Sequence, residues 1–464
     1  MGRVLFSFDT EDFVTPESDD ALKGIAQTLE RRGIRASFAM VGCKARALWT
    51  RCRKDVIEAV KRHDVQYHAN THMMWPQTTL YMSRMRWDEG LDLVVNTERH
   101  GIEDVSEVFD ARPMAYVRCG GNWDPREIYG MSLLGIREYV PSIYLLRGGA
   151  PVWFDNVLNG RYDFPIERYF RPDITLDDMK REFVKVMEQN AGSSLPIVAC
   201  AHPTMFRTSK WYDHHNQERR GVFPEKSKWK PAPLLEPKEF RRRLSILDQI
   251  VKFVTSIKGM TTETHSDVIR RHQEPARWLT RDRLRGIARN IRKDFDYQRL
   301  GTGYLSAADV FGALSLALAR WKSIGTIAPT LPVRRIIGPP EPTGEMRSRR
   351  DVSLSELAAA CGQVEREIAT QHRMPSFVRI AGRRIPPSTF LMAMADAFEV
   401  IMSGRKRNVV LKPQPLFPRC KDEVCKVVRA SSSELPEDFQ LGNIVTYTHQ
   451  QTWTIRPAIA RAAS

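Results

Sequence analysis

The chain of 464 residues lacks any uninterrupted apolar run of about 18 residues, the length that a helix needs to cross a bilayer. A strand-like stretch begins within a few residues of Met1 and leaves no space for the basic and apolar regions of a secretory signal. The seven cysteines follow no regular pattern, which favours a reducing compartment over a disulfide framework. Together these absences predict a cytoplasmic protein without a transmembrane segment.

Acidic residues are scarce in one part of the chain only. The net charge is +16, and residues 276–464 hold 30 Lys and Arg against 17 Asp and Glu, whereas residues 1–275 hold 41 against 38. A basic unit is suited to anionic glycan, nucleic acid or an acidic membrane surface, although a plain soluble surface is the simpler interpretation. No aromatic and basic motif of a known nucleic-acid reader is visible, so nucleic acid is not the expected partner.

The length predicts two domains, because single hydrophobic cores stop growing well below this size. Over the first 200 residues, strand-like and helical patterns alternate about seven times, which predicts a parallel α/β sheet. The number of units favours a barrel, with an open sheet as the alternative. A polar and aromatic insertion at residues 204–233 follows a strand, where long loops either cover a site or lack order. We place the domain boundary at residue 275.

Residues 276–464 are predicted to form a basic, helix-rich accessory domain. Amphipathic patterns occur at residues 282–295, 306–321, 353–370 and 387–401. Two segments, near 305–341 and 352–400, share a Ser-led helix start, a long helix and a Pro-Pro stop, which predicts an internal repeat. A homo-oligomer is a further option for this part of the chain.

The stretch RVLFSFDTEDF at residues 3–13 carries the first chemistry of the chain. Alternation in a strand puts Asp9 and Glu11 on one face with Leu5 and Ser7, and leaves an aliphatic and aromatic face opposite. Carboxylates at the carboxyl end of a parallel strand lie where α/β folds place their active sites. A solvated acidic turn is the alternative from this stretch alone.

Polar residues also follow three later strands. His68 and His72 are four apart in HANTH, and on a helical turn this spacing would put both imidazoles on one face, as metal ligands require. Two histidines and one carboxylate, from Glu11 or Asp12, would make an open zinc site. Arg118 precedes CGGNWD and His202 ends the apolar strand VACAHP.

These motifs, FDTED, HANTH, VRCGGNW and VACAHP, resemble in order and approximate spacing those of polysaccharide deacetylases, the NodB-homology group of carbohydrate esterase family 4. The resemblance covers residues 3–274. It implies a deformed (β/α)7-type barrel that binds one divalent metal, usually Zn²⁺, and hydrolyses an N-acetyl group.

The resemblance also implies roles for individual residues. Asp9 matches the general base, and His68 and His72 match the metal histidines. Thr10 stands where the usual ligand aspartate would be, so by the Asp-x-acid pattern of one branch Glu11 becomes the ligand. Arg118 matches an arginine that pairs with the base, and His202 matches the general acid. For binding substrate or the oxyanion, the candidates are Gly120, Gly121, Trp123 and Asp163.

Two departures leave the substrate open. Gly120 stands where the family has proline, and the acidic partner of His202 has no clear match beyond Asp163. The expected substrate is an N-acetylated amino sugar or glycan precursor. Alternatives are an amidohydrolase of cyclic amides or ureides, which the same branch includes, and a non-catalytic glycan-binding protein. MPSFVRIAGRRIPPSTFLMAMADAF in the C-terminal part resembles pseudomurein-binding repeats, and its basic surface suits an anionic glycan.

Overall fold

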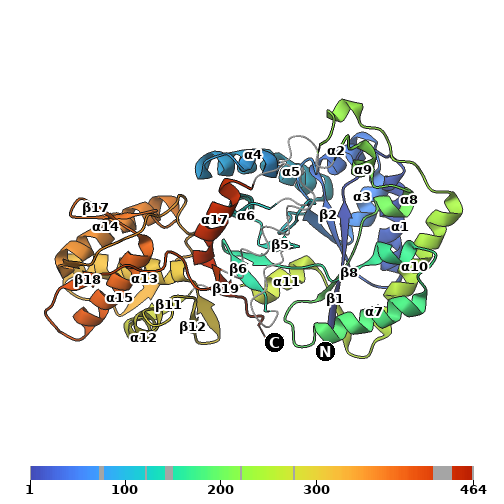
Figure 1. Cartoon of the computed structure of the whole chain (residues 1–464). Helices are drawn as coiled ribbons and strands as arrows, with labels where there is room; N and C mark the ends of the chain where they lie inside the picture. Colours follow the sequence, from blue (N-terminus) through green and yellow to red (C-terminus); the bar gives the residue numbers. More distant parts are fainter. Residues whose placement is uncertain are drawn as a thin grey trace.

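The computed structural model describes residues 2–72, 78–120, 123–141, 150–219, 222–274, 277–421 and 441–461 (Figure 1). The predicted domain boundary at residue 275 lies outside the described residues. The first part of the chain alternates strands and helices, in this order: β1 Gly2–Thr10, α1 Ser18–Arg31, β2 Ser37–Met40, α2 Gly42–Thr50, α3 Lys54–Lys61, β3 Asp64–Tyr67, α4 Thr78–Met82, α5 Trp87–Phe109, β4 Ala115–Val117, α6 Pro125–Leu133, β5 Glu138–Val140, β6 Val152–Phe154, β7 Val157–Asn159, β8 Phe164–Pro165, α7 Leu176–Gln189, β9 Ile197–Ala201, α8 Thr204–Arg207, α9 Tyr212–Asn216, α10 Pro237–Ser256, β10 Met260–Glu263 and α11 His265–His272.

A parallel sheet runs through β5, β4, β3, β2, β1, β9 and β8. The segment at residues 157–165 joins its two ends. Its first half, β7, pairs in parallel with β5, and its second half, β8, pairs in parallel with β9. Counting this bent segment once, the described strands form a ring of seven, as the sequence predicts.

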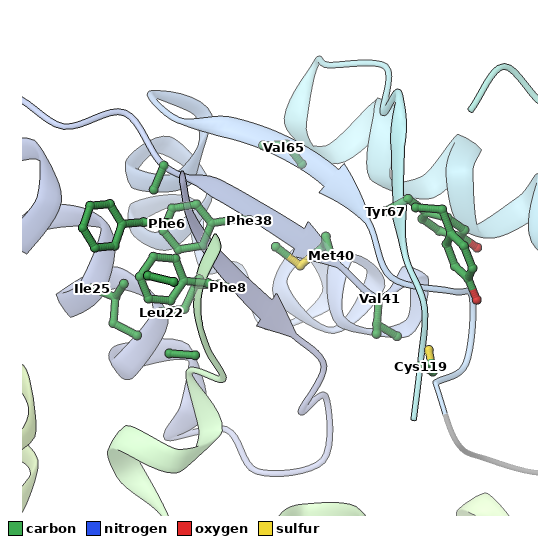
Figure 2. Packing of buried hydrophobic residues seen from close by; sticks show 14 of the residues in the cluster. Phe6, Phe8, Leu22, Ile25, Phe38, Met40, Val41, Val65, Tyr67 and Cys119 are labelled. Carbon is green, nitrogen blue, oxygen red and sulfur yellow. The ribbon is translucent and has the colours of Figure 1, made fainter. Parts of the chain in front are cut away.

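The outer face of β1 carries the apolar half of its alternation. Phe6 and Phe8 lie against Leu22 and Ile25 of α1, and the Phe8 ring stacks on Phe38 of β2 with centroids 5.1 Å apart (Figure 2). Phe6, Phe8 and Phe38 are at most 1% exposed. Burying apolar area is the dominant favourable term in folding. Because this apolar face of β1 packs on its neighbours outside the barrel, the opposite face of β1 points into the barrel interior.

The amino-terminal end of the barrel is closed by α11. Gly2–Leu5 of β1 pair with β10, and the chain then turns into α11 beneath the ring. His265 contacts Ser7 Oγ through Nε2 at 3.2 Å and Glu138 through Nδ1 at 3.0 Å. Ser266 donates to Asp64 Oδ1 at 2.6 Å. These polar contacts fill the bottom of the barrel and leave its carboxyl end for the site.

The remaining elements form a second unit with its own hydrophobic core, followed by a return to the barrel (Figure 1). They are β11 Trp278–Thr280, α12 Arg281–Ile291, β12 Gln298–Leu300, β13 Gly303–Leu305, α13 Ala307–Ile324, β14 Thr330–Pro332, β15 Arg350–Val352, α14 Leu354–Gln371, β16 Val378–Ile380, β17 Arg383–Ile385, α15 Pro387–Met402, β18 Val409–Leu411, α17 Asn443–Gln451 and β19 Arg456–Pro457.

The predicted repeat is not confirmed in the predicted ranges. Residues 305–341 contain the helix α13 and the strand β14, whereas residues 352–400 contain α14, a β-hairpin and most of α15. The elements instead occur twice in the order strand, helix, hairpin, helix, strand, and the first and last strands pair in each case: β11 with β14 and β15 with β18. The shared Ser-led starts of α13 and α14 are capping boxes at Ser306 and Ser353, which occur at many helix starts.

The last described segment packs on the barrel rather than on the second unit alone. β19 pairs with β6, so that Arg456 lies opposite Trp153. Ile444 of α17 and Ile455 belong to the barrel core, whereas Trp453 packs in the second core. The C-terminal end therefore contributes side chains to both cores.

The six described cysteines are free, and none of the described helices combines the length and hydropathy needed to span a bilayer.

His272 at the end of α11 generates a prediction about pH and stability. It is fully buried, its Nδ1 lies 2.9 Å from the Val268 carbonyl oxygen, and its Nε2 lies 3.2 Å from Ser194 Oγ. Burial lowers the pKa of His272 to about 4. The unfolded chain binds this proton more readily, so the His272 contribution to stability is lost as pH falls from about 6.5 towards 4. The loss between pH 7 and pH 5 should be on the order of 2 kcal/mol.

Urea unfolding of wild type and of His272→Gln at pH 7 and pH 5 measures this contribution. Glu98 and Glu127 have the opposite dependence, because burial raises the pKa of each to about 7. Wild type and H272Q both contain these two glutamates, so the difference between their changes in unfolding free energy is due to His272. We expect H272Q to lose less stability than wild type between pH 7 and pH 5. Exposed His100→Gln is the control, and an equal pH response of H272Q and wild type contradicts the prediction.

Candidate active site

The carboxyl end of β1 brings two carboxylates into the barrel. Ser7–Thr10 pair with β2 and Val4–Phe8 pair with β9, so Asp9 and Glu11 emerge between two neighbouring strands. Asp9 and Glu11 are each 3% exposed. Asp12 points elsewhere: its carboxylate accepts hydrogen bonds from the Val14 and Thr15 amides at 3.0 and 2.8 Å. Asp12 therefore shapes the turn, and Glu11 is the carboxylate beside the histidines.

Glu11, His68 and His72 meet in the structure. Glu11 Oε2 lies 2.8 Å from His72 Nε2 and 3.5 Å from His68 Nε2. The His68 and His72 rings have centroids 5.1 Å apart. Burial opposes ionisation of Glu11, but the charge and hydrogen bond of His72 and the nearby His68 imidazole lower the pKa of this carboxyl. The predicted His-His-Glu set is thus one contiguous cluster.

The HANTH segment is not the helical turn that its spacing suggests. Residues 68–72 form an irregular loop after β3, in which Ala69 has φ 69° and His72 has φ 56°. Two left-handed residues within five reverse the chain and return His72 towards His68. His68 and His72 therefore share a site through a strained loop. Each of the two left-handed residues costs about 1–3 kcal/mol of folding free energy.

The donor atoms of this cluster fit a divalent metal. His68 Nδ1 lies 2.6 Å from the Val117 carbonyl, so it carries the proton and leaves Nε2 as a lone-pair donor. Among the described residues, His68 Nε2, His72 Nδ1 and Glu11 Oε1 are buried without a hydrogen-bond partner. Buried polar atoms without partners cost stability, and a cation held by two imidazoles and a carboxylate would give His68 Nε2 and the Glu11 carboxylate a partner.

Cys119 is a neighbour that sequence reasoning missed. Its sulfur and one ring nitrogen each of His68 and His72 lie within 4.8 Å of one another. The thiol donates to the His68 carbonyl at 3.2 Å. Burial and the surrounding carboxylates raise the pKa of Cys119 well above its usual range. Glu11 Oε2 lies against both imidazoles, whereas the thiol is engaged by the His68 carbonyl, so Glu11 is the better-placed third donor.

Asp9 is positioned by a tyrosine rather than by the predicted arginine. The Tyr162 hydroxyl donates to Asp9 Oδ1 at 2.6 Å. Arg118 Nε donates to the Pro141 carbonyl at 3.0 Å, and among ion pairs between described residues Asp9 pairs with His202. Burial opposes ionisation of Asp9, but His68, His202 and Tyr162 lower its pKa. The expected pairing of Arg118 with Asp9 is therefore not found in the part of the chain that the structure describes.

His202 lies between two carboxylates. Its Nε2 is 3.4 Å from Asp9 Oδ2 and its Nδ1 is 2.8 Å from Glu167 Oε1. Burial alone would lower the pKa of His202, but the charge of Glu167 and the hydrogen bonds of Asp9 and Glu167 raise it well above its usual range. His202 is therefore held as an imidazolium, oriented by Glu167.

Glu167 is the acidic partner that sequence reasoning did not find. The candidate for that role, Asp163, instead accepts from the Val198 amide at 2.9 Å and pairs with Arg161 at 2.9 Å. Asp163 thus sits in the seam where residues 157–165 join β9. Glu167 follows in the 3-10 helix Ile166–Phe170, four residues further along YDFPIE. The sequence clue was only that a second acidic residue stands four positions beyond Asp163.

The other residues predicted to bind substrate or the oxyanion have different surroundings in the structure. Gly120 directly follows Cys119 in a left-handed conformation, with φ 45°. Trp123 is 3% exposed, its ring packs on Tyr139 and Phe154, and its Nε1 donates to Thr448 of α17 at 3.4 Å. Trp123 is therefore a core residue that contacts α17. Gly121 lies outside the described residues.

The insertion after β9 covers the site with aromatic side chains. The Trp211 ring stands edge-on to His202 with centroids 4.3 Å apart, and the Tyr212 ring lies 5.8 Å from the His72 ring. Tyr212 also packs on Phe13 and Trp229. A long loop in this position was expected either to cover a site or to lack order. The described part of residues 204–233 covers the site.

A buried cation fixes the turn that follows Glu11. Lys44 is 1% exposed, and its Nζ donates to the Asp12 carbonyl at 2.6 Å, to Ser18 Oγ at 2.7 Å and to Asp19 Oδ1 at 2.5 Å. Arg51 also reaches Asp19, at 3.1 Å. Since the Asp12 carboxylate and carbonyl are both engaged, the backbone leaving Glu11 has little freedom.

Lys44→Met should therefore destabilise the protein and loosen the metal donors. Removing one partner of a buried ion pair costs about 3–5 kcal/mol, and Arg51 keeps the loss at the lower end. Urea unfolding measures the loss, and metal analysis after dialysis should show weaker retention. Lys23→Met, which removes the exposed partner of Asp55, is the matched control and should change stability by less than about 1 kcal/mol. A K44M protein as stable as K23M contradicts this account.

No family model matches the chain, and no curated protein matches it. Solved structures of polysaccharide deacetylases of carbohydrate esterase family 4, the family whose motifs the sequence resembles, do match it. A family 4 carbohydrate esterase from Streptomyces lividans in complex with acetate is 12% identical over 56% of this chain and 91% of its own, with a TM-score of 0.31. A peptidoglycan deacetylase from Bacillus subtilis is 14% identical over 57% and 89%, also with 0.31. A family 4 pseudoenzyme from Bacillus anthracis is 9% identical over 57% and 65%, with 0.32. All three TM-scores are below 0.5, so the functional inference rests on the side chains of this chain itself.

Proposed function

We propose that the chain is a metal-dependent hydrolase that removes the acetyl group from an N-acetylated amino sugar or glycan precursor. The observation that carries the proposal is the buried convergence of Glu11, His68 and His72, with donor atoms that lack partners among the described residues. These three side chains would hold a divalent metal, for which Zn²⁺ is the best match to two imidazoles and one carboxylate. Such a metal, when bound, polarises an acyl oxygen and acidifies a water.

Asp9 is the proposed general base. It is ionised and adjacent to the donor cluster, and one of its oxygens is engaged by Tyr162 at 2.6 Å. The second oxygen faces the His202 imidazolium at 3.4 Å, and it is the oxygen that would accept a proton from attacking water. Tyr162 holds the carboxylate in orientation, the role that the resemblance gave to Arg118.

His202 is the proposed general acid. Its Nε2 faces the reacting region and its Nδ1 is held by Glu167 at 2.8 Å. An imidazolium there can protonate the departing amine nitrogen, without which the carbon–nitrogen bond of the tetrahedral intermediate does not break. Trp211 beside His202 presents an apolar ring surface, which is compatible with the apolar face of a sugar.

Asp9→Asn tests the base separately from the metal site. The variant should bind metal as wild type does and lose about 100-fold or more of its acetate release. Glu11→Gln should lose both metal and activity. Asp20→Asn, exposed on α1, is the control and should retain both. Full activity of D9N contradicts the assignment of the base, and full metal retention in E11Q contradicts the donor set.

Glu167→Gln tests the role of His202 as general acid, by comparing two substrates whose leaving groups differ in their need for a proton. An acetamide needs a protonated amine to leave, whereas 4-nitrophenyl acetate releases a stable phenolate. We expect kcat for the acetamide to fall about 100-fold and kcat for the ester to change little. Glu188→Gln, exposed on α7, is the control. Equal losses on both substrates would mean that Glu167 acts on folding or binding and not through His202.

A panel of N-acetylated sugars, sugar nucleotides and cyclic ureides, each assayed with and without chelator, identifies the substrate class. Acetate release sensitive to chelator supports the proposal. Chelator-sensitive ring opening of a ureide alone would support the amidohydrolase alternative. Absence of turnover despite stoichiometric metal would favour a non-catalytic glycan-binding protein.

A further inference from the structure

A cavity of about 490 Å³ lies between the barrel and the second unit. Its lining includes Arg137 and Arg270 of the barrel, Arg277 and Arg335 of the second unit, and Arg456 of β19. Met114 and Arg137 precede β4 and β5, and Arg270 lies on α11, so the cavity is at the amino-terminal end of the barrel. Asp9 and Glu11 are at the opposite, carboxyl end. The cavity is therefore separate from the candidate active site.

The charges around this cavity are unbalanced. Among the described residues that line it, Glu274 is the only acidic one, and it is shared by Arg335, Arg456 and Arg277 at 2.7, 2.9 and 3.3 Å. Arg335 and Arg270 also pair with Asp309 and Asp267 outside the lining. Five guanidinium groups thus face three carboxylates in all, and cations in excess of their partners favour an anion.

The most buried of these arginines is Arg456, at 2% exposed. Its Nη1 donates to Asn156 Oδ1 at 3.2 Å, and its guanidinium lies 5.5 Å from the centroid of the Trp153 ring. Burial, together with the charge of Arg335, lowers the pKa of Arg456. Keeping a guanidinium buried beside a second one is unfavourable unless further negative charge is brought in.

Trp153 supplies an independent observation. It lines the cavity, is 6% exposed, and its indole Nε1–H has no hydrogen-bond partner among the described residues. A buried indole usually has an acceptor. The Trp153 indole and the arginines together make the lining rich in hydrogen-bond donors. A negatively charged ligand would supply the acceptors for them.

The space suits a small organic anion. A volume near 490 Å³ is within the range of small-molecule sites. A neighbouring hollow of about 640 Å³ shares Gln273, Glu274 and Arg277 with the cavity and adds Trp278, which is 62% exposed. An exposed indole beside cationic groups can stack on a flat ring.

We propose that this arginine-lined cavity binds a small phosphorylated molecule of the nucleoside diphosphate class. The phosphates accept from Arg137, Arg270 and the Trp153 indole, and the ring lies in the hollow beside Trp278. The ligand would join the barrel to the second unit. This site does not depend on the proposed hydrolase activity.

Isothermal titration of the full chain with pyrophosphate and with ADP tests the site. We expect one saturable site for each probe, with ADP the tighter ligand. Arg137→Met combined with Arg270→Met removes two exposed lining charges and should weaken both probes by about tenfold or more. The control combines Arg62→Met with Arg171→Met, which removes two exposed arginines elsewhere and should leave both affinities within about twofold.

Trp278→Ala separates the two parts of the ligand, because it should weaken ADP and leave pyrophosphate unchanged. If R137M/R270M does not fold, R270M alone replaces it, with a smaller loss expected in the same direction. The proposal is overturned if wild type binds neither probe saturably, or if the lining variant and the control lose affinity equally. Loss of hydrolysis in D9N with unchanged probe binding would show that the two proposals stand independently.

Discussion

Three carboxylates are buried within four residues at the end of β1, and the architecture around them follows from the need to compensate each one. Buried charges are tolerated only when they are paired and hydrogen-bonded. The Asp9 carboxylate is stabilised by contacts with Tyr162 and His202, and the Glu11 carboxylate by the two histidines that follow β3. The Asp12 carboxylate accepts hydrogen bonds from amides of its own turn and from the Thr204 hydroxyl, the latter at 2.8 Å. The partners come from distant parts of the chain, so these carboxylates are stable only when the barrel has closed.

Closure itself depends on one bent segment, residues 157–165. Its first half pairs with β5 and its second half with β9, and Asp163 reinforces the second junction by accepting from the Val198 amide. Tyr162 lies inside this segment and Glu167 directly after it. The residues that orient the proposed base and acid are therefore fixed by the same backbone that completes the ring. A substitution that loosened this seam would be expected to affect both proton-transfer residues.

Much of the fold and part of the site could be predicted, for identifiable reasons. Strand alternation separated Asp9 and Glu11 from Asp12, because local geometry alone decides which face a side chain takes. Glu167 and Tyr162 could not be found in this way, since their contacts with His202 and Asp9 exist only after residues 157–170 pack against β9. The spacing of His68 and His72 indicated a shared site correctly but a helical turn wrongly.

The C-terminal half shows a similar limit. A shared Ser-led start, long helix and Pro-Pro stop suggested a repeat over residues 305–341 and 352–400, but a Ser-led capping box satisfies the free amides of any helix start and so carries little information about where a repeating unit begins. The decisive features, β19 pairing with β6 and Arg456 reaching Glu274, are long-range. They return the chain to the barrel after the second unit, so that unit is attached through both of its ends. Attachment at two ends restricts rotation of the second unit against the barrel, and a cavity between the two can then keep a defined shape.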